Sequence, residues 1–362
     1  MTYEVNPAMS LVHELPAVRR FRFPFTRPRA FFRLGGKVYE AVRDLGERDT
    51  REPLLLARRE NRQGPGSLRL IERLHRPEDS RLRQRLVDEL RQGLRMRHPG
   101  LLQLRDVAAE GSHLYVVREY VGGWRLDALL RLGPLLGRRP LSVGAVCQVG
   151  AELAEVLYHL HTWTDGHGRP MGLFHGDLSP LHVRLTLGGR VKLEGFGTLG
   201  SRVAARLGFR REWSDTLRES LYWPPVDDVR CARGVSRDVY ALAVVLLELL
   251  RGRPLWEPLA PERWRWGLAP NEVRRELSEL QVPVSLRELL GEVLLGEAFP
   301  ACDRAAGWLR DSLRWQARCG HEGLAWELRE VRRQAAAQLR PWDSPLAVLE
   351  ALPDAVRRAA RA

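Results

Sequence analysis

Apolar and polar residues alternate in the first third of the chain with the two-residue period of β-strands. The alternation predicts strands over 31–34 and 37–43, and Gly35-Gly36 between them is a signal for a two-residue hairpin. Three further apolar runs predict strands over 54–57, 68–74 and 114–121. Residues 61–67 are polar and rich in glycine, so we expect a turn there.

Elsewhere the apolar positions follow the longer period of helices. Residues 81–96 predict one helix among the strands, ending before His98-Pro99, and the apolar spacing of 141–161 predicts another. Residues 239–250 are almost wholly apolar, which indicates a buried helix. Two more helices are expected, one after the capping-box pattern that begins at Ser285 and one in the charged stretch 321–339.

This distribution predicts an α+β protein with a small β-rich part followed by a larger helical part. We expect an irregular basic and aromatic arm over 1–29 and a helical tail over 316–362.

The composition favours a soluble globular protein over a nucleic-acid or membrane partner. The formal net charge of +13 comes almost wholly from scattered arginines, since Lys37 and Lys192 are the only lysines. The arm over 1–29 could stack on bases, which keeps a nucleic-acid-binding alternative open. No apolar run of about 18 residues predicts a transmembrane helix, and the N-terminal residues lack a signal-peptide pattern, so we expect a cytoplasmic protein.

Two segments of the helical part carry the main chemical signal. Residues 174–183 read FHGDLSPLHV and residues 189–197 read GRVKLEGFG. Their sequence and spacing resemble the catalytic loop and the metal-binding DFG segment of the eukaryotic-type serine/threonine protein kinases of bacteria. Five further segments resemble that family in the family's order: 38–42, 97–101, 114–121, 236–242 and 249–254.

The resemblance implies a bilobal protein-kinase-like fold over about 30–315. The β-rich N-terminal lobe, with one main helix and the hinge, spans 30–121, and the larger helical C-terminal lobe spans 122–315. A His-Gly-Asp-Leu loop also occurs in small-molecule phosphotransferases that resemble aminoglycoside and choline kinases. Those usually continue with an Asp-Trp metal motif, so Phe196-Gly197 and residues 236–254 favour the protein kinases.

Most residues that the resemblance implies for phosphoryl transfer are replaced. Asp177 keeps the position of the catalytic base, and Glu89 keeps that of the helix glutamate. Glu72 takes the position of the strand-three lysine, in a register open by one residue, while His182 takes that of the metal-binding asparagine and Gly195 that of the DFG aspartate. Glycine offers no ligand and imidazole is a poor one for magnesium, so we expect no metal site.

The implied nucleotide pocket also departs from the family. Its positions are Gly36, Lys37, Val38, Leu70, Arg118, Glu119, Val121 and Arg184. Leu70 replaces an alanine, and Arg118 and Arg184 bring cations to an apolar slot, so we expect no ATP cofactor. Lys37 could replace the missing lysine, which supports an alternative in which a divergent serine/threonine kinase uses Asp177 and Lys37.

The architectural positions persist. His175 and Phe196 match the internal spine, and Asp238 matches a residue that accepts hydrogen bonds from the catalytic-loop backbone. We also expect Arg118 to pair with Glu72, Glu89 or both in place of the family's lysine–glutamate bond.

A chain that keeps the scaffold and loses the chemistry is best explained as a binding module. The sequence therefore predicts a pseudokinase that acts as a scaffold or allosteric regulator of another protein, with an active kinase as a candidate partner. The alternatives are the divergent kinase and a basic nucleic-acid-binding protein on a kinase scaffold.

Overall fold

The computed structural model of the chain describes ten stretches, namely 30–47, 53–61, 64–74, 79–110, 113–197, 221–225, 234–255, 267–296, 304–317 and 319–338. The chain forms two compact units. The first contains Met1–Arg97, Leu102–Val121 and Phe196–Glu212, and the second contains His98–Leu101, Gly122–Gly195 and Trp213–Ala362. The predicted arm over 1–29, on which the nucleic-acid alternative rests, lies outside the described residues.

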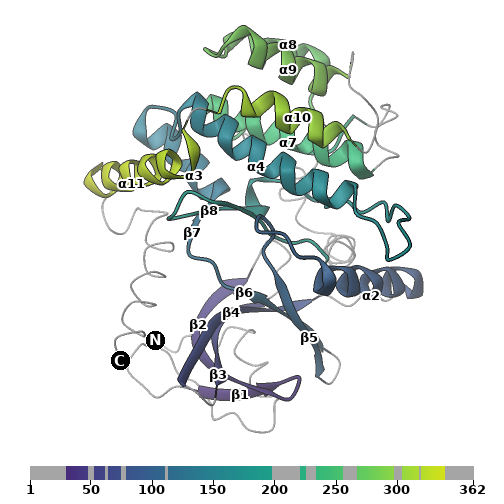
Figure 1. The fold of residues 1–362 in the computed structure, drawn as a ribbon. Coiled ribbons are helices and arrows are strands. Elements are labelled where there is room, and N and C mark those ends of the chain that lie inside the picture. The colour runs from purple at the N-terminus through teal and green to yellow at the C-terminus, as the bar shows by residue number, and fades with distance from the viewer. Residues whose placement is uncertain are drawn as a thin grey trace. The chain divides into compact units, whose positions relative to one another are not determined.

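An antiparallel sheet of six strands forms the first unit, in the order β1-β2-β3-β4-β6-β5 (Figure 1). The strands are β1 (Ala30–Leu34), β2 (Lys37–Glu47), β3 (Pro53–Asn61), β4 (Gly64–Leu74), β5 (Leu104–Glu110) and β6 (His113–Glu119). Gly35 and Gly36 form the first hairpin with φ values of 54° and 74°, which glycine adopts without a steric penalty. The helix α2 (Ser80–Arg95) follows β4.

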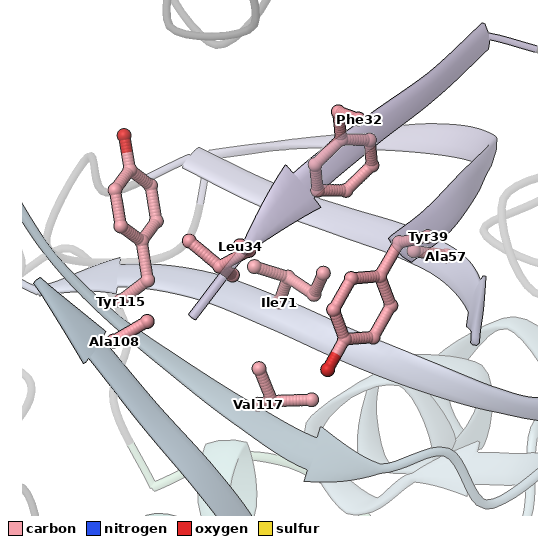
Figure 2. Packing of buried hydrophobic residues seen from close by; sticks show 8 residues of the cluster. All are labelled: Phe32, Leu34, Tyr39, Ala57, Ile71, Ala108, Tyr115 and Val117. Atoms are coloured by element: carbon pink, nitrogen blue, oxygen red, sulfur yellow. The ribbon is translucent and has the colours of Figure 1, made fainter. Parts of the chain in front are cut away.

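The two faces of the sheet bury different clusters. On one face, Leu86 and Leu90 of α2 pack with three strand residues, Leu74, Leu104 and Val116. The opposite face buries a second cluster, shown in Figure 2: Phe32, Leu34, Tyr39, Ala57, Ile71, Ala108, Tyr115 and Val117. This division follows from the alternation of side chains along each strand.

The sheet curls until its two edges meet. Lys37, at the start of β2, donates to the Asp106 carboxylate on β5, the strand at the opposite edge. A side-chain carbon on Gly35 would lie 3.2 Å from Cβ of Ala108, also on β5. The second cluster is therefore enclosed by the curl of the sheet. The strand β1 contributes Phe32 and Leu34 to it.

Helices dominate the second unit. They are α3 (Leu126–Leu136), α4 (Val143–His161), the 3-10 helix η1 (Pro180–His182), α7 (Gly234–Arg251), α8 (Pro270–Glu279), α9 (Val284–Leu295), α10 (Ala305–Arg314) and α11 (Gly320–Gln338). A three-stranded antiparallel sheet accompanies them, in the order β7 (Gly123–Arg125), β8 (Val183–Thr186) and β9 (Val191–Leu193). α4 packs against α7 and α10 in the centre of the unit (Figure 1).

Most predicted elements are confirmed, including the long helices and the Gly35-Gly36 hairpin. Two expectations are wrong. The strand β4 already begins at Gly64, inside the expected turn, and α9 begins at Val284 after Pro283, so Ser285 lies within the helix and does not cap it. No helix among the described residues is long and apolar enough to cross a membrane.

Candidate active site

The loop that carries Asp177 belongs to the second unit, between α4 and β8. The Asp177 carboxylate is buried, and its Oδ2 lies 3.7 Å from Nε2 of His182, the last residue of η1. The other ring nitrogen of His182 lies 3.3 Å from Oγ of Ser179. The structure therefore brings the predicted base position and the predicted asparagine position together, with the imidazole between a carboxylate and a hydroxyl.

Hydrogen bonds within the second unit also orient His175. Its Nε2 donates to the backbone oxygen of Glu194 at 2.7 Å, and its Nδ1 accepts a longer bond of 3.3 Å from the amide of Asp177. A carbonyl oxygen can only accept, so the ring carries its proton on Nε2. His175 thus connects the Asp177 loop to the segment that precedes Gly195.

Asp238, on α7, anchors the same loop. Its Oδ1 accepts from the amide of Gly176 and its Oδ2 from the amide of His175, both at 2.7 Å. The expectation that Asp238 binds the loop backbone is confirmed. A third donor, Nε2 of His161, reaches Oδ2 at 3.0 Å. Sequence reasoning missed His161, because only the tertiary fold distinguishes it from the neighbouring His159.

The position that aligns with the DFG aspartate has no side chain to offer. Gly195 has a φ of 90°, in a region that L-amino acids rarely adopt. The carboxylate of the preceding Glu194 is fully buried and accepts from Nε of Arg184 at 2.6 Å. Arg184 also donates to the backbone oxygen of Gly123 at 3.4 Å. Glu194 is therefore engaged by a cation, and the charge of Arg184 is compensated.

In the first unit, β4 and β6 place Glu72 and Arg118 on one face of the sheet. Arg118 is the direct partner of Leu70, and Glu72 follows Leu70 by two residues, so all three side chains share a face. Nε of Arg118 donates to Oε2 of Glu72 at 3.4 Å, and its Nη1 donates to the backbone oxygen of Phe196 at 3.5 Å. Arg118 is only 1 % exposed. The predicted pairing with Glu72 is confirmed.

The sheet register also settles which residue of β4 faces α2. Glu72 lies opposite Val116, which belongs to the cluster under α2, whereas Ile71 belongs to the opposite cluster. Glu89, on α2 itself, accepts from Nε of Arg85 at 3.1 Å. Glu72 and Glu89 therefore each have an arginine partner, so neither carboxylate lacks a counter-charge.

The assignment of Gly36, Lys37 and Val38 to the glycine-rich loop needs correction. In the family, the strand after that loop leads directly into strand three, and here the strand before β4 is β3. Residues 48–52, between β2 and β3, lie outside the described residues. The error arose because the extra edge strand β1 adds a second hairpin upstream.

Leu70, Glu119 and Val121 are also predicted to line the nucleotide pocket, and all three lie in the first unit. Leu70 is buried on β4. Glu119 accepts from Nη2 of Arg105 at 3.1 Å, and its amide donates to the backbone oxygen of Gln103. Val121 is the last residue of the first unit before the chain enters the second. Their part in nucleotide binding stays a prediction.

The side chains at the aligned positions differ from the ligands that magnesium prefers. Magnesium prefers several oxygen ligands, usually carboxylates together with phosphates. At the positions aligned with the family's ligands, Gly195 supplies no atom and His182 supplies an imidazole that contacts Asp177. Within the described stretches, no group of three or more His, Cys, Asp or Glu side chains is arranged to hold a metal ion.

A recess beside Asp177 adds two residues that sequence reasoning missed. The guanidinium of Arg237 lies 4.6 Å from the centre of the Trp223 ring, a cation–π geometry. The recess is lined by Gly176, Asp177, Leu178, Ser179, Tyr222, Trp223, Arg237, Asp238 and Ala241. The recess therefore places an aromatic ring and an arginine beside the buried Asp177 carboxylate.

Comparison with known proteins identifies the family. The sequence model of the protein kinase domain matches residues 58–265, more than half of the chain. This chain belongs to the protein kinase domain family. The kinase domain resembles the tyrosine-protein kinase MasK of Myxococcus xanthus, with 33% identity over 172 residues that cover 45% of this chain and 25% of MasK. It also resembles the serine/threonine-protein kinase pakA of Talaromyces marneffei, with 24% identity over 195 residues that cover 54% of this chain and 27% of pakA.

The matches therefore span about a quarter of the length of these two relatives. Among solved structures, the PknI kinase domain of Mycobacterium tuberculosis superposes with a TM-score of 0.52 and 23% identity, covering 79% of this chain and 98% of that domain. A point mutant of the same domain gives a TM-score of 0.52 at 22% identity, covering 79% and 97%. The predicted fold is confirmed as kinase-like and bilobal, with a curled antiparallel sheet in one lobe and helices in the other.

Proposed function

We propose that this kinase domain is a pseudokinase that binds and regulates another protein without transferring phosphate. The ion pair between Arg118 and Glu72 carries the proposal. Phosphoryl transfer in the family needs a lysine on the phosphates, held by a glutamate. Here the strand position of that lysine holds a carboxylate, and a buried arginine from the neighbouring strand neutralises it. The two buried charges of Arg118 and Glu72 thus compensate each other without bound ATP.

The acidic residues of the second unit also support the pseudokinase proposal. The buried Glu194 is engaged by Arg184, Gly195 lacks a side chain, and His182 contacts Asp177. Glu194 therefore has its counter-charge within the chain. A group that already has its partner inside the protein does not need a metal ion to compensate its charge.

For the partner we propose another protein, with an active kinase as the candidate class, and a cytoplasmic setting. The recess with Trp223 and Arg237 supports a protein partner, since tryptophan and arginine are enriched among residues that dominate binding energy.

Magnesium-ATP should leave the melting temperature of the domain unchanged. A ligand at 100 times its dissociation constant stabilises the folded state by roughly 2.7 kcal/mol, which a thermal-shift assay detects. A catalytically active kinase domain in the same buffer serves as the positive control, and ADP and ATP without magnesium complete the series. A rise in melting temperature that depends on both ATP and magnesium contradicts the proposal.

The second candidate, a divergent kinase, is favoured by the kinase names of the relatives and by the retained Asp177. Its other proposed residue, Lys37, donates to Asp106 on the edge strand β5 and belongs to the upstream hairpin. We expect no transfer of labelled phosphate to a generic protein substrate or to the chain itself. Transfer by the wild type that disappears in Asp177→Ala, with Asp165→Ala as the control in an exposed loop, would establish the kinase and remove the pseudokinase.

A further inference from the structure

The last described helix, α11, lies outside the segment that matches the kinase family and is nevertheless docked on the second unit. α11 packs against α3 and α4 (Figure 1). Its inner face is apolar and buried, and consists of Leu324, Ala325, Leu328, Val331 and Ala335. The family match ends at residue 265, so the match itself does not account for this helix.

The N-terminus of α4 is joined to α11 through one side chain. Glu327, on α11, accepts two hydrogen bonds from Ser142, the residue that caps α4. The amide of Ser142 donates to Oε2 at 2.8 Å, and its hydroxyl donates to Oε1 at 2.6 Å. The same hydroxyl accepts from the amide of Ala145 at 3.2 Å, which makes Ser142 an ordinary helix cap as well. We call the Ser142–Glu327 pair the latch.

Residues just before the latch have the charge pattern of a kinase substrate. Arg138 and Arg139 precede Ser142 by four and three residues. Arg138 is exposed, and its guanidinium donates to Oε1 of Gln334 on α11. Ser142 is exposed as well. Two arginines upstream of a serine suit a serine kinase with an acidic peptide-binding groove, because kinases select substrates by complementary charge.

We propose that Ser142 is a phosphorylation site for an arginine-directed serine kinase acting in trans, and that its phosphorylation releases α11 from α4. In the reaction, the Ser142 oxygen forms a bond to the γ-phosphorus of ATP while the bond from that phosphorus to the bridging β,γ-oxygen breaks. ADP leaves, and the hydroxyl proton passes to the base of the modifying kinase. The site is independent of whether this kinase domain itself binds ATP.

Release follows from the chemistry of the latch. The ester oxygen of phosphoserine has no proton, so it can no longer donate to Glu327. The phosphate carries a charge of about −1.5 to −2 at neutral pH, directly beside the Glu327 carboxylate. The N-terminus of α4 favours the phosphate and its upstream arginines can pair with it, so the glutamate is the group that is displaced. The apolar face of α11 then becomes available to a partner.

Pro140 and Leu141 are buried, and Pro140 lies beside Gly133 of α3, so the segment before Ser142 is not free to enter the groove of another kinase in the docked state. We expect the modifying kinase to act on molecules in which the latch and this segment have opened, and the phosphate then holds them open by removing the latch. This gives a specific expectation. Glu327→Gln, which weakens the latch, should be phosphorylated at Ser142 several-fold faster than the wild type.

The test compares latch variants by hydrogen exchange over residues 320–338. Ser142→Asp keeps a capping side chain but places a carboxylate against Glu327, whereas Ser142→Asn has the same shape without the charge. We expect exchange about tenfold faster in Ser142→Asp than in Ser142→Asn. Adding Glu327→Gln to Ser142→Asp should restore slow exchange, while adding Glu330→Gln, on the same helix but bonded to Arg333 within it, should not.

The phosphorylation itself is tested with the cyclic-AMP-dependent serine kinase as an arginine-directed probe. Mass spectrometry should locate the phosphate on Ser142, and the phosphorylated protein should show the fast exchange of Ser142→Asp. Two results would overturn the proposal. One is a phosphorylated protein with unchanged protection of α11. The other is a peptide of residues 136–146 that accepts phosphate while neither the wild type nor Glu327→Gln does.

Discussion

Asp238→Ala, on α7, should lower the stability of the second unit more than any single change in the loop that carries Asp177. The carboxylate is 1 % exposed and accepts from the amides of His175 and Gly176 and from the ring of His161. Removing it leaves three buried donors without their acceptor, at roughly 1–3 kcal/mol each. We expect a loss of at least about 3 kcal/mol, and a drop of roughly 6–12 °C in the melting temperature of that unit.

Asp238→Asn separates hydrogen bonding from packing, because asparagine has the same shape and keeps one acceptor oxygen. Asp238→Asn should lower the stability of the second unit less than Asp238→Ala does, but more than a surface substitution does. Asp311→Ala is the control, since Asp311 has a side chain 60 % exposed and its loss should change stability by about 0.5 kcal/mol or less. If Asp238→Ala melts like Asp311→Ala, the anchoring of the loop by α7 is wrong.

Arg118→Met should destabilise the first unit by about 3–5 kcal/mol, because it leaves the Glu72 carboxylate buried without its cation. Methionine fills much of the same volume, so the loss reports the charge rather than a cavity. Adding Glu72→Gln removes the unpaired charge and should recover most of the stability. The measurement is the free energy of unfolding from denaturant titration, with circular dichroism as the signal.

A second arginine–glutamate pair in the same sheet serves as the control for the Arg118 and Glu72 variants. Arg105 of β5 donates to Glu119 of β6 at 3.1 Å, a shorter distance than the 3.4 Å between Arg118 and Glu72, but the Arg105 side chain is 44 % exposed. Exposed pairs contribute about 0–1 kcal/mol, so Arg105→Met should have a small effect. Equal losses for the two arginines, or no recovery with Glu72→Gln, would mean that Arg118 does not compensate a buried charge.

The local sequence pattern was sufficient to predict most helices and strands and to recognise the protein kinase family. The apolar period predicted α4 and α7 within a few residues, and the Gly35-Gly36 hairpin follows from what glycine alone can adopt. The loop at 174–183 and the segment at 189–197 pointed to the protein kinase domain because they combine specific residues at a specific spacing. Pairing Arg118 with Glu72 was also predictable, since neighbouring strands place alternate side chains on one face.

Other features depended on contacts between segments distant in sequence. The extra strand β1 is recognisable only when the sheet order is known, and without that order the glycine-rich loop was assigned one hairpin too early. His161 and Glu194 acquire their roles from partners 77 and 10 residues away. Nothing in their local sequence marks either one, because a lone histidine or glutamate has the same pattern whether it is buried or exposed.

The amino-acid sequence by itself determined that this protein has a kinase-like fold of two lobes, and it predicts that most phosphoryl-transfer positions are replaced. Both conclusions rest on residue identity and spacing, which need no coordinates. Only the tertiary structure decided how the replaced positions are compensated, through Arg118 with Glu72 and Arg184 with Glu194, and that Glu327 joins Ser142. A buried charge is tolerated only where the fold brings its counter-charge within a few ångströms, and that proximity is set by strand register and helix docking.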